Sequence, residues 1–297
     1  MYTGDKASWI SLVTIRDRSD AFPDSDAADR LDVVPHVVAL FRHPLKGFTP
    51  ETRDELEVQE DGRIAGDRVL AFRFADAARP EERDGLDYWP KSKGLALQDF
   101  PSLARLSVAY DDAERRVRVA LGSEVLVEAG IDEPGRRLVV DTVTQYVLSS
   151  PDAARLHAPG RLPLVLVGDG VTSRFQDRAR GFVSVHTRES AEALDAALPA
   201  SVDDRRFRSN VVIAGAAAWS ELDWSGPVRI GDVLFAPQGP IVRCLATHAN
   251  PDTGERDAPI LTTLTRRFGQ HQPTLGRLLL PVSGGGRIRV GDDVRVD

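Results

Sequence analysis

The first half of the chain contains short apolar runs that are typical of β-strands, at residues 33–41, 55–58, 68–74, 103–110 and 116–121. Apolar and polar residues alternate along the last two runs, which predicts a hairpin. Arg68 is expected to open the strand 68–74. Pro44 ends the first run, so Lys46 is expected in a turn.

The second half combines three predicted helices with further strands. Apolar residues recur at helical spacing along 136–149, and shorter helices are predicted at 189–198 and 259–268. The predicted strands are 164–167, 182–186, 211–214, 228–235, 241–245, 278–282 and 288–296. The pattern therefore predicts an α+β fold that is mostly β, with a few peripheral helices.

Three polar or glycine-rich segments predict loops. Residues 77–95 are charged and indicate a long surface loop. Residues 168–180 form a polar loop that we expect to border a pocket. The triple glycine 284–286 predicts a hairpin turn, because no helix follows it to form a phosphate cradle.

Composition narrows the possible partners. The 297 residues are 42% hydrophobic, enough for a sizeable core, and the net charge of -7 argues against nucleic-acid binding. Small molecules or another protein are the expected partners. Residues 16–32 predict an irregular arm, and the apolar patch 9–15 is too short to span a membrane. We expect a soluble cytoplasmic protein without a signal peptide.

The single cysteine, Cys244, is the main candidate for chemistry. One cysteine excludes an internal disulfide, an iron–sulfur cluster and a cysteine-rich zinc site. Cys244 follows Arg243 where an apolar run gives way to the turn 250–254, and an adjacent guanidinium favours the thiolate. A packing role remains open, as does a nucleophilic Cys/His hydrolase. A zinc site formed by Cys244 and His248 is disfavoured, because the turn that follows them argues against both residues lying on one face of a helix.

Several motifs in order along the chain resemble a known family. The MOSC domain of molybdenum-cofactor sulfurases is similar to the second half in Arg208-x-Asn210, Glu221-x-x-Trp224, Ile230-Gly231-Asp232, Arg243-Cys244 and Pro251-Asp252-Thr253-Gly254. Its companion N-terminal β-barrel is similar to the first half in His43-Pro44-Leu45-Lys46-Gly47 and Gly66-Asp67-Arg68. The pairing resembles the mitochondrial amidoxime-reducing component and its bacterial relatives.

The resemblance implies a domain plan. Residues 1–32 would be an irregular N-terminal arm. Residues 33–155 would form the MOSC N-terminal β-barrel-like domain, and residues 156–297 the MOSC β-barrel domain. The site would lie between these two domains.

The resemblance also implies a cofactor and its ligands. The molybdenum cofactor, a molybdopterin, would take Cys244 as metal ligand and catalytic residue, since soft thiolates suit such metals. Lys46, Arg68 and Arg208 would hold the phosphate and pterin, and Asn210 the pterin edge. Gly47 and Arg243, which flank two of these residues, complete the expected cofactor-binding set.

The implied function is an oxidoreductase that uses molybdenum and is independent of pyridoxal phosphate. It would reduce N-hydroxylated or N-oxide small molecules with electrons from a separate protein. Two alternatives remain: a cofactor or sulfur carrier with a persulfide on Cys244, and a non-catalytic homologue. Gly47 stands where a serine is usual, Val242 where many relatives have serine, and Leu278 near a usual aromatic. These departures leave the substrate class open.

Overall fold

A computed structural model describes residues 34–178, 180–199 and 201–297, and residues 34–297 form one compact unit. The predicted arm at 1–32 lies outside the described residues. The fold is mostly β, as predicted from the sequence. No helix in the described part of the chain is long and apolar enough to cross a membrane.

The strands and helices follow one another with short connections. The strands are β1 (His36–Arg42), β2 (Glu51–Arg53), β3 (Glu55–Val58), β4 (Ala71–Phe74), β5 (Glu81–Arg83), β6 (Leu86–Tyr88), β7 (Leu106–Asp111), β8 (Arg116–Leu121), β9 (Glu124–Gly130), β10 (Leu164–Val167), β11 (Val183–Thr187), β12 (Val211–Ala214), β13 (Val228–Ile230), β14 (Val233–Val242), β15 (Thr274–Pro281), β16 (Gly286–Arg289) and β17 (Val294–Val296). The α-helices are α1 (Glu133–Leu148), α2 (Ala153–Leu156), α3 (Arg188–Asp195) and α4 (Ile260–Arg266).

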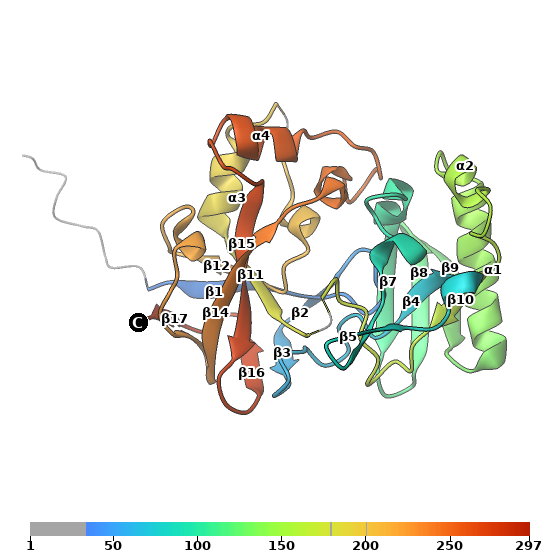
Figure 1. Ribbon diagram of the computed structural model, residues 1–297, viewed down its shortest axis with the longest axis horizontal. Coiled ribbons are helices and arrows are strands. Elements are labelled where there is room, and N and C mark those ends of the chain that lie inside the picture. Colours follow the sequence, from blue (N-terminus) through green and yellow to red (C-terminus); the bar gives the residue numbers. More distant parts are fainter. Residues whose placement is uncertain (1–33, 179, 200) are drawn as a thin grey trace, which may run out of the picture. The chain divides into compact units, whose positions relative to one another are not determined.

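The largest sheet has eight strands in the order β17-β13-β14-β15-β11-β12-β1-β2 and curls into a half-barrel (Figure 1). Its pairs are antiparallel except β11 and β12, which are parallel and are connected through α3. β1 comes from the first part of the chain, yet it pairs with β12, with Leu40 opposite Val211. Residues far apart in sequence therefore pair near one edge of this sheet.

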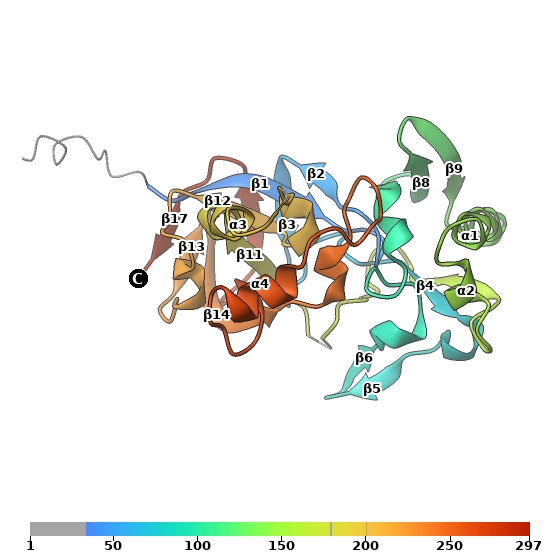
Figure 2. The same ribbon diagram turned by 90° about the horizontal axis from the view of Figure 1, so that it is seen from above.

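A second group of elements surrounds the three-stranded sheet β7-β8-β9 (Figures 1 and 2). The predicted hairpin is confirmed, with Leu106 opposite Leu121 and Asp111 opposite Arg116. Helix α1 is also confirmed, and its Val139, Val143 and Val147 are fully buried because a spacing of four keeps them on one face. Two-stranded pairs β4–β10, β3–β16 and β5–β6 complete the pattern.

Two hydrophobic clusters correspond to these two groups. One contains apolar side chains of β7, β8, β9, α1, β4 and β10. The other joins apolar side chains of the large sheet with those of β3 and β16, and it includes Val37, Leu56 and Ile288, which come from opposite ends of the described chain. Three strand pairings, β1–β12, β4–β10 and β3–β16, cross the predicted boundary between residues 155 and 156. That boundary stays a prediction.

Several details of the sequence interpretation are wrong. The predicted strand 228–235 is two strands, β13 and β14, and the predicted strand 241–245 is the end of β14 followed by a 3₁₀ helix. The segment 77–95 contains the hairpin β5–β6, because Asp84 and Gly85 both adopt positive φ and make the tight turn. Arg68 precedes its strand in a left-handed conformation, and residues 103–105 belong to a 3₁₀ helix. The segment 284–286 does not join paired strands, because β16 leaves the large sheet and pairs with β3.

The buried carboxylate of Glu221 links two strands of the large sheet, β11 and β15, with helix α3. Its Oε2 accepts hydrogen bonds from the hydroxyls of Thr187 (3.0 Å) and Ser190 (2.8 Å), at the start of α3. Its Oε1 accepts from the backbone N–H of Gly276 in β15 (3.2 Å). Glu221 is completely buried, so no solvent water reaches these three donors to accept their hydrogen bonds in its place.

We expect Glu221→Ala to lower the free energy of unfolding by about 3 kcal/mol, because three buried donors lose their acceptor. Urea unfolding measures this change. Glu192→Ala, on the exposed face of α3, is the matched control and should change stability by less than about 0.5 kcal/mol. Equal losses in both variants would contradict the role given to Glu221.

Candidate functional site

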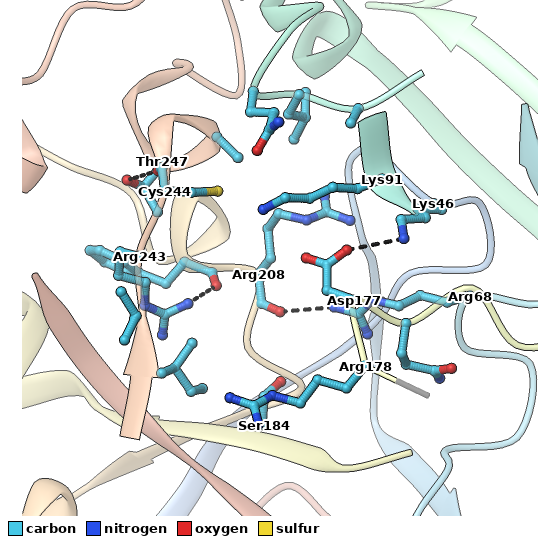
Figure 3. A pocket seen from close by; sticks show the side chains of 18 of the residues that line it. Lys46, Arg68, Lys91, Asp177, Arg178, Ser184, Arg208, Arg243, Cys244 and Thr247 are labelled. Atoms are coloured by element: carbon cyan, nitrogen blue, oxygen red, sulfur yellow. Dashed lines mark hydrogen bonds and ion pairs between the residues drawn. The ribbon is translucent and has the colours of Figure 1, made fainter. Parts of the chain in front are cut away.

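A cavity of about 340 Å³ lies between the large sheet and the segments that carry Lys46, η2 (Lys91–Lys93) and Asp177 (Figure 3). Six of the seven predicted site residues line it: Lys46, Gly47, Arg68, Arg208, Arg243 and Cys244. The predicted pocket loop 168–180 also borders it, through Gln176, Asp177, Arg178 and Arg180. Asn210 is not among the lining residues.

Cys244 lies where β14 ends and the 3₁₀ helix Leu245–His248 begins. Its thiol is partly exposed and points into the cavity (Figure 3). Its carbonyl oxygen accepts hydrogen bonds from the N–H and the hydroxyl of Thr247, both at 3.0 Å. The backbone of Cys244 is thus fixed while its sulfur stays accessible.

The neighbouring Arg243 is a structural clamp of the same wall. Its Nε donates to the carbonyl of Leu275 (2.8 Å), and its Nη1 donates to the carbonyl of Phe207 (2.5 Å). Burial lowers the pKa of Arg243 to about 10, while Cys244 and Glu221 act in the opposite direction. The guanidinium therefore stays charged at neutral pH and anchors the strand that carries the thiol.

Lys46 lies on the other side of the cavity and forms an ion pair with Asp177 (Nζ to Oδ1, 3.0 Å). Its side chain is buried, and this burial lowers the pKa of Lys46 although Asp177 acts to raise it. Burial also acts to raise the pKa of Asp177, but the ammonium of Lys46 outweighs it and the net shift is downward. The contact ties the loop that carries Asp177 to the turn that carries Lys46.

Arg68 and Arg208 meet between these two walls. Both adopt the left-handed backbone conformation, with φ of 54° each, which costs a residue other than glycine about 1 kcal/mol. The Nη2 of Arg68 donates to the carbonyl of Arg208 (3.3 Å), and Arg208 donates to the carbonyl of Phe48. Burial, then the charge of Arg68, lowers the pKa of Arg208 to about 10. Such backbone strain is typical of functional sites.

Asp67 connects the three motif segments below the cavity. Its Oδ1 accepts from the backbone N–H of His43 (2.7 Å) and from the side-chain amide of Asn210 (3.3 Å), and its Oδ2 accepts from Arg68. Burial acts to raise the pKa of Asp67, but Arg68 and His43 outweigh it and hold that pKa well below its usual range. Asp67 is therefore an ionised, buried centre of the network.

Asn210 is fully occupied within this network. Its side-chain amide also donates to the carbonyl of Phe41 (3.2 Å), and its Oδ1 accepts from the hydroxyl of Ser184 (2.7 Å). The structure thus locates Asn210 behind the cavity wall, where it positions Asp67 and Ser184. Its predicted contact with a pterin stays a prediction.

Comparison with known proteins gives a family match for the second part of the chain. Residues 173–295 match the family described as "MOSC domain". Residues 173–295 form a MOSC domain. The predicted resemblance is thereby confirmed for this part of the chain, which carries Arg208, Arg243 and Cys244.

Similar curated proteins are molybdenum cofactor sulfurases. Those of Drosophila grimshawi and Drosophila mojavensis are 40% identical over 88 and 92 residues, or 28% and 29% of this chain. The sulfurase of Drosophila ananassae is 33% identical over 116 residues, 37% of this chain. The matches span only 11%, 11% and 14% of these relatives. The YuaD protein from Bacillus subtilis aligns over 88% of this chain and 94% of its own, with 12% identity and a TM-score of 0.39.

The first half contributes a glycine whose geometry explains one departure from the family pattern. Gly47 has φ of 87°, and a Cβ there would lie 2.7 Å from the carbonyl oxygen of Leu95. A serine would therefore be strained and would collide with backbone. The other departures, Val242 and Leu278, line the cavity beside the MOSC domain's thiol, so they give this wall an apolar surface.

Several residues of the site were missed from the sequence. Asp177, Arg178 and Arg180 lie in the predicted pocket loop, and Lys91 lies in a segment predicted only as a surface loop. Asp67 was present in a recognised motif, but no role was assigned to it. The Gly-Asp-Arg motif itself was the signal for Asp67, because a carboxylate between two basic segments is a natural counter-ion.

We expect Gly47→Ala to lower the free energy of unfolding by about 2 to 4 kcal/mol, because backbone strain and a collision with Leu95 add up. Gly291→Ala is the matched control. Gly291 has a similar φ of 92° but nothing within 4 Å of an added Cβ. The control should lose only about 1 kcal/mol. Thermal or urea unfolding that gives equal losses would refute the close approach at Gly47.

His43 predicts a pH dependence of stability. It is completely buried, and burial together with Arg208 and Arg68 lowers its pKa to about 3 from 6.5. Between these values the unfolded chain binds more protons than the folded one, so stability falls as the pH falls. From pH 7 to pH 5 the wild type should lose about 2 kcal/mol more than His43→Gln.

Urea unfolding at the two pH values measures this difference. His157→Gln, at an exposed histidine, is the control and should keep the wild-type pH dependence. If His43→Gln loses as much stability as the wild type on acidification, His43 is not held neutral in the folded protein.

Proposed function

We propose that the cavity binds the molybdenum cofactor and that the protein is a molybdenum-dependent oxidoreductase. The observation that carries the proposal is that the single thiol of the chain and a group of basic side chains face one cavity from opposite walls. A soft metal ligand and a phosphate-binding group are the two requirements of a metal held by a phosphorylated pterin.

The residues present fit this cofactor. The cavity volume of about 340 Å³ lies within the usual range for small-molecule sites. Lys46, Arg68 and Arg208 supply ammonium and guanidinium donors for the phosphate, and Cys244 supplies the thiolate. The ion pair of Lys46 with Asp177 indicates that this wall already accommodates an anionic oxygen.

Each side chain has a distinct task in this proposal. Lys46, Arg68 and Arg208 bind the phosphate, while Arg243 holds the end of β14 so that Cys244 keeps its direction. Asp67 and Asn210 orient Arg68 and the segment before it. Gly47 brings the backbone next to Lys46 close to residues 95 and 96.

When bound, the cofactor supplies two-electron redox chemistry at molybdenum. The proposed overall reaction takes an N-hydroxylated compound, two electrons and two protons to the corresponding N–H compound and water. A separate electron-transfer protein supplies the electrons, because a chain with one cysteine cannot hold an iron–sulfur cluster. Leu97, Phe182 and Leu278 offer apolar surface against which the substrate body packs and from which water is excluded.

A second function is supported by the name of the similar proteins. The Drosophila relatives are named molybdenum cofactor sulfurases, and the accessible thiol of Cys244 suits a persulfide carrier. In that case Cys244 would carry sulfur transiently and would not remain a metal ligand. Mass spectrometry of the intact protein distinguishes the two, because a persulfide adds the mass of one sulfur atom.

We expect protein from a cofactor-competent host to contain nearly stoichiometric molybdenum that is lost in Cys244→Ala. Lys46→Gln should weaken cofactor retention by about tenfold or more, because a charge-assisted bond to phosphate contributes about 1.5 to 3 kcal/mol. Elemental analysis after gel filtration measures retention. Lys93→Gln, an exposed lysine outside the cavity, is the control and should retain cofactor as the wild type does.

The same preparations test the reaction. Reduced viologen with an amidoxime should give turnover that Cys244→Ser abolishes. Wild-type protein without molybdenum would refute cofactor binding. A persulfide on Cys244 with no turnover would instead support the carrier function.

A further inference from the structure

We propose that the cavity selects substrates that carry an anionic group, a carboxylate or a phosphate ester, on an apolar body, and that Lys91 binds that group. The inference rests on the proposed function, because it names the substrate class of the same cavity. It follows from the basic side chains that remain after the cofactor phosphate has been bound.

The cavity lining is strongly unbalanced in charge. Among the described residues that line it, one side chain is acidic, Asp177, and eight are basic: Lys46, Arg68, Lys91, Arg178, Arg180, Arg206, Arg208 and Arg243. Four of the basic groups have protein partners: Lys46 pairs with Asp177, Arg68 with Asp67, Arg206 with Asp257, and Arg243 donates to backbone carbonyls. Arg208 likewise donates to the carbonyl of Phe48, so Lys91, Arg178 and Arg180 are left without a hydrogen bond or ion pair to any residue that the structure describes.

The cofactor phosphate accounts for only part of this excess. Arg208, together with Lys46 and Arg68, is assigned to the phosphate in the proposed function. Lys91, Arg178 and Arg180 then remain on the cavity lining without an ion pair to a described residue. The carboxylate of Asp177 attracts Lys91, but it already pairs with Lys46. A cavity of this kind concentrates anions by its field and favours a ligand that supplies the missing charge.

Lys91 is the best placed of these residues. It is partly buried and forms no hydrogen bond or ion pair with any residue that the structure describes. Figure 3 shows its ammonium end pointing from the side of Lys46 into the cavity toward Cys244. Taking an ammonium group partly out of water costs free energy unless an anion meets it. An anionic group of a substrate close to Cys244 would meet it.

The rest of the lining describes the body of such a substrate. Apolar side chains cover part of the cavity wall: Ala96, Leu97, Phe182, Ile241, Val242 and Leu278. The guanidinium of Arg178 lies 6.0 Å from the ring centre of Phe182, at the exposed edge of this surface. A ligand with an apolar ring and an anionic substituent complements both features.

A binding experiment tests the inference without any turnover. Benzoate, phenyl phosphate and benzyl alcohol are titrated into the full chain and followed by NMR. Both anions should bind at least about tenfold more tightly than the alcohol, and Lys91→Gln should remove most of that advantage. Lys93→Gln is the matched control, because it lies in the same 3₁₀ helix but outside the cavity. It should bind all three as the wild type does.

The outcomes separate this site from the phosphate site. Equal binding of anions and alcohol would overturn the inference. So would a loss of anion binding in Lys46→Gln but not in Lys91→Gln, because the anion would then occupy the cofactor phosphate site. If both anions bind more tightly than the alcohol but to different extents, the tighter one identifies the preferred group as a carboxylate or a phosphate ester.

Turnover provides a second and separable readout. The reaction of 4-carboxybenzamidoxime or benzamidoxime consumes two electrons from reduced viologen and two protons, and releases the amidine and water. Lys91→Gln should lower kcat/KM for the carboxylate compound about tenfold more than for the neutral one, whereas Lys93→Gln should leave the ratio unchanged. If anions bind through Lys91 but neither compound is reduced, the proposed reduction fails and anion selection stands.

Discussion

The arrangement of the site depends on one buried charge, the carboxylate of Asp67. It binds the backbone of His43, the side chain of Arg68 and the amide of Asn210, which come from three separate motif segments. A carboxylate remains ionised in the interior only with several donors around it. This requirement forces the three segments together and thereby brings Lys46, which follows His43, and Arg208, which precedes Asn210, to one cavity.

The same constraint sets the electrical character of the cavity. Arg208 and Arg243 are desolvated strongly enough to lower the pKa of each to about 10, yet both remain charged at neutral pH. His43 is neutral at physiological pH, because burial and the charges of Arg208 and Arg68 lower its pKa to about 3 although Asp67 acts to raise it. The guanidinium groups that face the cavity therefore stay charged, and the buried imidazole of His43 does not change its charge near neutral pH. The cavity keeps its positive field over the physiological pH range.

The sequence predicted the parts of this picture that depend on local pattern or short motifs. Alternation identified the hairpin β7–β8, helical spacing identified α1, and motifs selected Lys46, Arg68, Arg208 and Cys244. It missed features that depend on contacts between distant segments. Lys91 and Asp177 lie in irregular segments without periodicity, and only the folded chain shows that they face the cavity. The sequence pattern placed Arg68 in a strand, because amino-acid composition does not show that the backbone of this residue adopts a left-handed conformation.

The pairing of β1 with β12 and of β3 with β16 affects how the family match should be understood. The matched residues 173–295 contain β12 and β16 but neither partner strand. A fragment with these limits would leave one edge of the large sheet open and would expose Ile288 and Val211, both completely buried in the full chain. The matched segment is therefore smaller than the packed unit, and moving it to another protein with its sheet and core intact would require β1 and β3 to go with it.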